Sequence, residues 1–132
     1  MESAGELVRR FLTLMESRRL DAAETLLAPD ALILFPGGKQ FASQREMVAA
    51  AQGRYRWVKK HVDRLDAFGS ADGDIVYVLG TLYGVNVHGV PFDSVRYIDR
   101  FVVRDGLIAR QEVWNDLAES GVLARRQPEP PP

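Results

Sequence analysis

The 132-residue chain contains no cysteine, which excludes disulfides, thiol catalysis and cysteine-ligated metal sites. It has only two histidines, His61 and His88, and their spacing does not fit a zinc site, so we expect no bound metal. No apolar run approaches the ~18 residues that span a membrane. The N-terminus is acidic and leads into an amphipathic run, unlike a signal peptide, so we expect a cytoplasmic protein.

Neither sign of charge is in excess, because 17 Lys and Arg residues face 18 Asp and Glu residues. This balance argues against nucleic-acid binding and against attachment to an anionic membrane. The chain lacks a phosphate loop and a serine nucleophile elbow, and we expect no cofactor. Its length is typical of one domain, which we place at residues 1–122. The proline-rich residues 123–132 are predicted to form a mobile tail.

Three capping-box patterns, each a Ser or Asp followed three residues later by Glu, mark the expected helix starts. They begin at Ser3, Asp21 and Ser43, and apolar residues at helical spacing follow each of them. The third helix is expected from Gln44 to about Gly53. A short apolar run at residues 31–35 predicts a buried strand.

After Tyr55 the pattern changes to the alternation of strands. Four consecutive antiparallel strands are predicted, the first with a bulge near Val58, over residues 55–68, 75–87, 92–104 and 107–115. The last two are joined by an Asp105-Gly106 turn. Helices followed by a meander predict an α+β fold, with the helices packed on one face of a curved sheet.

Asp99 is the most informative single residue, because alternation places it on the apolar face of its strand, between Tyr97 and Phe101. The opposite face of that strand carries three arginines and is expected to face water. A carboxylate among apolar neighbours needs a reason, since burying an unpaired charge is costly. One reason is a role in a pocket, and the other is a structural ion pair with a neighbour such as Arg110.

The chain resembles the nuclear transport factor 2-like superfamily, and within it the SnoaL-like polyketide cyclase branch. The resemblance rests on the element order, the turn at 36–38, the hairpin over 98–108 and the closing segment 113–116. It implies a cone-shaped, curved antiparallel sheet wrapped around N-terminal helices, with an internal apolar cavity. It also implies a homodimer formed through the outer sheet face.

Ketosteroid isomerases of this fold have three functional positions, and the sequence keeps one of them. The aspartate base is replaced by Phe35, and the helix that carries their oxyanion tyrosine offers only apolar residues such as Phe11 and Met15. Their second oxyanion donor, an aspartate that donates a hydrogen bond as a neutral acid, corresponds to Asp99. The resemblance therefore disfavours the ketosteroid isomerase mechanism but keeps Asp99 as a candidate.

The register of the superfamily places Tyr83 inward beside Asp99, so these two residues are our catalytic candidates. The ligand-binding candidates are Phe11, Met15, Phe35, Trp57, Tyr97, Phe101, Trp114 and Asn115. The sequence leaves alternatives open for the aromatic residues, because the tyrosines and tryptophans can be ordinary core and Trp114 can be a dimer contact. The Lys59-Lys60 pair is expected to be a solvated face. Neither face of the last strand is cleanly apolar, and a bulge can switch them.

Two functions fit these observations. One is a cofactor-free isomerase, cyclase or dehydratase that binds a hydrophobic carbonyl compound and transfers a proton. The alternative is a non-catalytic domain for hydrophobic-ligand binding or dimerisation. A second titratable group within hydrogen-bond reach of Asp99 across the cavity would favour the enzyme, whereas a cavity with only apolar side chains and one paired aspartate would exclude it.

Overall fold

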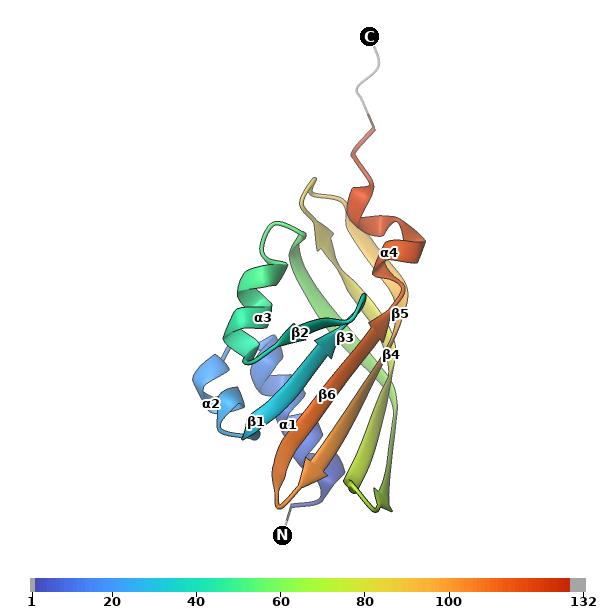
Figure 1. Ribbon diagram of the computed structural model, residues 1–132. Helices are drawn as coiled ribbons and strands as arrows, with labels where there is room; N and C mark the ends of the chain where they lie inside the picture. The colour runs from blue at the N-terminus through green and yellow to red at the C-terminus, as the bar shows by residue number, and fades with distance from the viewer. Residues whose placement is uncertain (1, 129–132) are drawn as a thin grey trace.

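The computed structural model describes residues 2–128, which form helices packed on one sheet. The helices are α1 (Ala4–Glu16), α2 (Leu20–Glu24), α3 (Gln44–Ala51) and α4 (Leu117–Ser120), with a 3-10 turn η1 (Val122–Ala124). The strands are β1 (Leu27–Phe35), β2 (Lys39–Phe41), β3 (Tyr55–Ser70), β4 (Gly73–Asn86), β5 (Pro91–Arg104) and β6 (Leu107–Asn115). This confirms the predicted α+β fold (Figure 1).

The six strands form a single mixed sheet in the order β2-β1-β6-β5-β4-β3. The predicted meander of β3 to β6 is antiparallel throughout, and β1 joins β6 as a parallel strand. The three-residue strand β2 was not predicted from the sequence. In Figure 1, α1 lies behind the sheet while β1 and β6 face the viewer, so the sheet has an inner, helix-covered face and an outer face.

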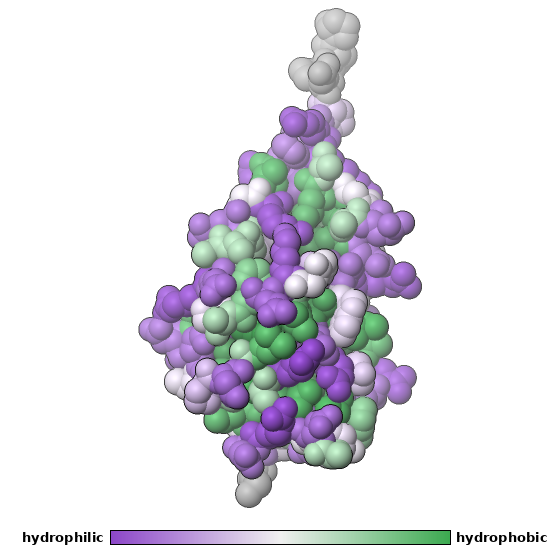
Figure 2. Space-filling model, in the orientation of Figure 1, coloured by the Kyte–Doolittle hydropathy of each residue, from purple (hydrophilic) through white to green (hydrophobic). Residues whose placement is uncertain are grey.

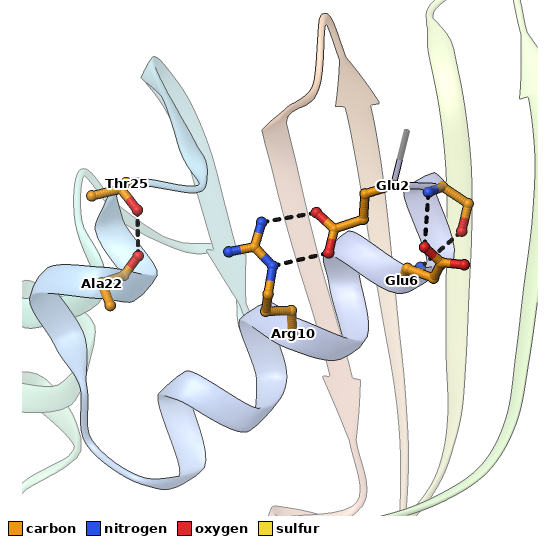
Figure 3. A network of polar contacts seen from close by, with 6 residues as sticks. Glu2, Glu6, Arg10, Ala22 and Thr25 are labelled. Atoms are coloured by element: carbon orange, nitrogen blue, oxygen red, sulfur yellow. Dashed lines mark hydrogen bonds and ion pairs between the residues drawn. The ribbon is translucent and has the colours of Figure 1, made fainter.

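The two longer helices begin at capping residues that the sequence predicted. The Ser3 hydroxyl accepts from the Glu6 amide at 3.1 Å, and the Glu6 carboxylate accepts from the Ser3 amide in return (Figure 3). The Ser43 hydroxyl caps α3 by accepting from the Glu46 amide at 3.1 Å, without the reciprocal bond. Figure 3 also shows the ion pair between Arg10 and Glu2, which extends the polar side of α1. These caps fix where the helices that cover the sheet begin.

Two glycines on the inner face of β4 let β3 curl over it. A Cβ atom at Gly80 would lie 1.8 Å from the carbonyl oxygen of His61, and one at Gly84 would lie 2.1 Å from that of Trp57. The register of β3 against β4 shifts in both regions, between Tyr55 and Trp57 and between Val62 and Arg64. Bulges opposite glycines increase the local bend of a sheet. We attribute the curvature that opens space beneath α1 to these sites.

The outer face of β5 and β6 carries large apolar side chains among charges. Ile98 and Trp114 are register partners with exposed fractions of 39% and 53%. Beside them, Arg100 and Arg110 both pair with Glu112. Figure 2, which views this side, shows green apolar residues interspersed with purple polar ones. This mixed face has no covering element among residues 2–128.

The C-terminal segment is tied to the sheet as far as Arg125. The buried Asn86 amide donates to the carbonyls of Val122 and Arg125 at 2.9 and 2.7 Å. Residues 129–132 lie outside the described residues, so the mobile tail over 123–132 stays a prediction for them. None of the described helices is long and apolar enough to cross a membrane.

Candidate active site

A cavity of about 800 Å³ lies between α1, α3 and the inner face of the sheet. Its buried wall combines apolar and polar side chains, namely Phe11, Met15, Gln44, Leu82, Tyr97, Asp99, Gln111 and Val113. Its other end is lined by exposed residues of α1 and of the segment that leads into β3. The volume is that of a site for a drug-sized molecule.

Asp99 lies in this wall, fully buried, and forms an ion pair with Lys60 of β3. Lys60 donates to Oδ2, while Oδ1 has no hydrogen-bond partner. The Lys60 side chain keeps 28% exposure, so the pair joins a dry carboxylate to a partly hydrated ammonium. Asp99 therefore acts here as an acceptor, in contrast to the neutral donor that the resemblance implied.

The partner of Asp99 is Lys60 and not Arg110, the neighbour predicted from the sequence, so the expectation that Lys60 is fully solvated is also wrong. Arg110 pairs with Glu112 on the outer face. Lys60 is the register partner of Leu82, which is a buried inner-face residue of β4, and this places Lys60 inward. The β3 bulges break the simple alternation, so the sequence alone could not separate Lys60 from Lys59.

Tyr97 forms a second polar group of the wall, next to the ion pair. Its hydroxyl donates to the carbonyl oxygen of His61 at 3.2 Å, and the Lys60 Nζ lies 5.0 Å from the centre of its ring. Burial raises the pKa of Tyr97 above its ordinary value, and the negative charges of Asp99 and Asp63 raise it further. Tyr97 therefore stays protonated and can donate a hydrogen bond at neutral pH.

A buried amide pair completes the polar wall, and the sequence analysis missed it. The Gln44 amide donates to the Gln111 side-chain oxygen at 2.9 Å, and Gln44 Oε1 is buried without a partner. Glu24 positions Gln44, because its carboxylate accepts from the Gln44 backbone amide at 2.6 Å. A glutamine in the first turn of a helix carries no sequence signal for burial, so periodicity could not find it.

Five of the eight predicted ligand-binding residues line the cavity together with Asp99. They are Phe11, Met15, Phe35, Tyr97 and Asn115. The inner face of β6, which the sequence left undecided, carries Gln111, Val113 and Asn115. A register shift near Ala109 produces this placement, as the predicted bulge allowed.

Four of the predicted site residues are not among the residues that line the cavity: Tyr83, Trp57, Phe101 and Trp114. Phe101 lies on the inner face as predicted, whereas the other three do not. Tyr83 lies on the outer face, where its ring stacks on His61 at 4.3 Å and meets Trp57 edge-on at 5.9 Å. Both faces of β4 are apolar, so alternation could not orient Tyr83. Trp114 is exposed on the outer face, and Phe101 packs against Phe11 in the core.

Metal-ligating side chains do not gather in the part of the chain that the structure describes. No group of three His, Asp or Glu residues is close enough to hold an ion there. The polar groups of the cavity wall can together accept, donate and transfer protons.

The comparisons with known proteins agree with this architecture. TerC, crystallised with polyporic acid, is 16% identical, with a TM-score of 0.76 over 91% of this chain and 97% of TerC. A nuclear transport factor 2-like protein of unknown function from Burkholderia pseudomallei is 20% identical, with a TM-score of 0.74 over 91% of this chain and 96% of its own.

A proposed polyketide cyclase from Pseudomonas putida is 18% identical and covers the same shares of the two chains, with a TM-score of 0.68. No curated protein matches the chain in sequence. At these identities the solved structures show the shared fold alone. Residues 8–111 match the SnoaL-like domain, so the chain belongs to the SnoaL-like domain family and has the nuclear transport factor 2-like fold that its sequence predicted.

Proposed function

We propose that the chain binds an apolar carbonyl compound in its cavity and transfers a proton on it without a cofactor, as an isomerase, cyclase or dehydratase. The observation that carries this proposal is the Lys60–Asp99 contact in the cavity wall. Asp99 thereby has a second titratable group within hydrogen-bond reach, which is the feature that separates the catalytic from the non-catalytic alternative.

The two groups divide the chemistry of an enolisation between them. Asp99 Oδ1 has no partner and can accept a proton from the carbon next to the carbonyl group. The breaking C–H bond leaves its electron pair on the carbonyl oxygen as an enolate. The Lys60 ammonium has three N–H donors and uses one toward Asp99, so the others can stabilise this oxygen.

Return of the proton to another atom of the substrate gives isomerisation, and attack of the enolate on a second carbonyl gives cyclisation. This assignment differs from the ketosteroid isomerase arrangement, in which the base stands at the position of Phe35. Two relatives support the class of ligand: TerC was crystallised with polyporic acid, and the Pseudomonas putida relative is described as a proposed polyketide cyclase.

Deuterium exchange into 2-tetralone, an apolar ketone with acidic protons, tests the proposal. In D₂O, the protein should accelerate loss of the proton signal next to the carbonyl above the buffer rate, as followed by proton NMR. Asp99→Asn and Lys60→Met should lower this acceleration by about 100-fold or more. Asp93→Asn, an exposed carboxyl change on the same strand, is the matched control and should exchange like the parent.

Binding of 2-tetralone without exchange would contradict the enzymatic proposal and favour a non-catalytic ligand-binding domain. The observation behind this second candidate is Phe35, an apolar ring in the cavity lining where the family's base would be. Saturable shifts of 2-tetralone signals with an exchange rate equal to buffer would identify it.

We also propose that two copies of the chain associate through the outer face of β5 and β6. The exposed Ile98 and Trp114 pair is the support for this dimer, since large apolar side chains gathered on a sheet face mark interaction sites.

A further inference from the structure

The exposed end of the cavity carries positive charge that the rest of the chain does not balance locally. Four exposed arginines, here called the arginine rim, border it: Arg9, Arg18, Arg54 and Arg56. Apart from Asp99, which Lys60 neutralises, Glu16 is the only carboxyl group that residues 2–128 contribute to the lining. Because the whole chain has a net charge of −1, this concentration of cations is local to the cavity mouth.

None of the four arginines of the rim forms an ion pair within residues 2–128. The described salt bridges join other cations, such as Arg10, Arg45 and Arg64, to their carboxylates. Guanidinium groups without a carboxylate partner attract anions. At the opening of a low-dielectric cavity, the electric field of these groups is focused into the cavity. Arginine is also the side chain that best fits planar anionic groups.

Arg18 is held at the mouth by its backbone and by a hydrogen bond. Its φ of 58° lies in the left-handed region, which is uncommon outside glycine, and its guanidinium donates to the Met15 carbonyl at 2.8 Å. Tyr55 lines the cavity beside it. Burial raises the pKa of Tyr55, and the nearby positive charges of Arg18 and Arg54 partly offset this rise. Arg18 and Arg54 therefore act on the same part of the cavity.

The buried end of the cavity lacks hydrogen-bond donors for two of its polar groups. Asp99 and Gln44 both line the cavity, and each has one buried acceptor oxygen without a donor, Oδ1 of Asp99 and Oε1 of Gln44. Buried polar groups in native proteins are nearly always hydrogen-bonded, by protein, water or ligand. Two such acceptors in one wall favour a molecule that brings O–H or N–H groups to this end.

We infer that the cavity takes an apolar organic acid: a molecule whose anionic group lies at the arginine rim and whose O–H or N–H group reaches Asp99 and Gln44. This inference rests on the proposed function and narrows its substrate class. Between the two polar ends the body of the ligand would contact apolar side chains of α1, α3 and the sheet, such as Met15, Val48 and Leu82.

A pair of fluorescent probes with one skeleton tests the anion requirement. The anion is 1-anilinonaphthalene-8-sulfonate, and the neutral reference is N-phenyl-1-naphthylamine, which lacks the sulfonate. The parent protein should bind the sulfonate about tenfold more tightly, as two partly exposed charge contacts can supply. Raising the ionic strength from about 0.01 M to about 1 M, which shortens the Debye length from about 30 to about 3 Å, should abolish this preference.

Substitutions of the rim arginines test which residues cause the preference for the sulfonate probe. Arg18→Gln and Arg54→Gln should each weaken sulfonate binding several-fold and leave the neutral probe unchanged, whereas Arg18→Lys and Arg54→Lys should retain most of the preference. Arg104→Gln changes an exposed arginine away from the cavity lining and should have no effect. Arg18→Gln also loses the contact with Met15, so Arg54→Gln carries the test if that variant does not fold.

Ala51→Phe, which fills part of the cavity, should weaken both probes and so show that they bind inside it. Equal affinity for the two probes, or a preference that Arg54→Gln leaves intact, would overturn the inference while the proposed function stands. Failure of both probes to bind, with Ala51→Phe no different from the parent, would overturn the proposed function as well.

Discussion

At the scale of single residues, the Lys60–Asp99 pair is the feature on which both stability and chemistry depend. Asp99 is fully buried, while Lys60 reaches water, so the two partners are not equivalent. Removing the cation strands a buried carboxylate, whereas removing the carboxylate leaves an ammonium that solvent can still hydrate.

We therefore expect Lys60→Met to cost about 3 kcal/mol of unfolding free energy, near the lower limit for breaking a buried pair because Lys60 is partly exposed. Asp99→Asn should cost about 1 kcal/mol, since Lys60 can still donate to the amide oxygen. The double variant should be more stable than Lys60→Met alone. Urea denaturation of all four proteins measures this coupling, and strictly additive losses would mean that the two side chains do not interact.

Tyr97 predicts a pH dependence of stability. Because burial raises its pKa in the folded state, the folded protein holds this proton to a higher pH than the unfolded chain does. The stabilisation of the folded state by the protonated Tyr97 is complete below the unfolded tyrosine pKa of about 10. It is lost as the pH rises above this value. Tyr97→Phe should lower stability at neutral pH by about 1 kcal/mol through its lost bond to His61.

The same variant should lose stability less steeply above about pH 10. Denaturation midpoints across this range measure the slope, part of which should remain because burial also raises the pKa of Tyr55. A Tyr97→Phe slope equal to that of the parent would contradict the account of Tyr97.

Sequence reasoning found Asp99 but not its partner, for a physical reason. Asp99 is on the regularly paired part of β5, residues 95–102, which has one polar and one apolar face, so alternation orients it. Lys60 is on a bulged strand, and Tyr83 is on a strand with two apolar faces, so alternation fails for both. The Gln44 amide is buried only because elements distant in sequence meet over it.

At the scale of elements, the glycines of β4 determine how closely β3 can approach and how far the sheet bends. Alanine in place of a strand glycine usually adds stability, by about 0.5–1 kcal/mol. At Gly80 the sign should reverse, because the new Cβ would overlap the His61 carbonyl oxygen.

We expect Gly80→Ala to lower the unfolding free energy by about 1–3 kcal/mol, as overpacking does elsewhere. Gly69→Ala is the matched control on β3, where the nearest atom to a new Cβ is 3.8 Å away, and it should be neutral or stabilising. Thermal unfolding of the two variants compares them directly. If Gly80→Ala proves as stable as Gly69→Ala, the close approach of β3 does not shape the sheet.

The helices and long strands were predictable because their signals are local. Capping boxes and apolar periodicity mark α1 and α3, and the Asp105-Gly106 turn, with both residues at positive φ, joins β5 to β6 as predicted. The short strand β2 has only three residues and no pattern of its own. It is an edge strand that pairs only with β1 in the sheet.

At the scale of the whole molecule, the two sheet faces differ in what covers them. The inner face builds the cavity, and we propose that the outer face joins two copies of the chain. The expectations of a cone shape, a cavity and a dimer came from the family resemblance rather than from composition. The polar lining of the cavity could be identified only from the three-dimensional arrangement.

The dimer proposal predicts that Trp114→Glu gives a monomer, because a charge at the centre of a buried apolar contact is costly to desolvate. Val87→Ser, which changes an exposed apolar residue in the turn after β4, is the control and should leave the dimer intact. Light scattering at micromolar concentration distinguishes the two states. A parent protein that is already monomeric would refute this use of the outer face.

The most direct test of the central claim, that Lys60 and Asp99 act together on one ligand, is a crystal structure of the protein with 2-tetralone bound. The account predicts the ketone oxygen within hydrogen-bond distance of the Lys60 ammonium and the neighbouring carbon next to Asp99 Oδ1. A ketone bound in the cavity away from both groups, or bound only outside it, would contradict the account.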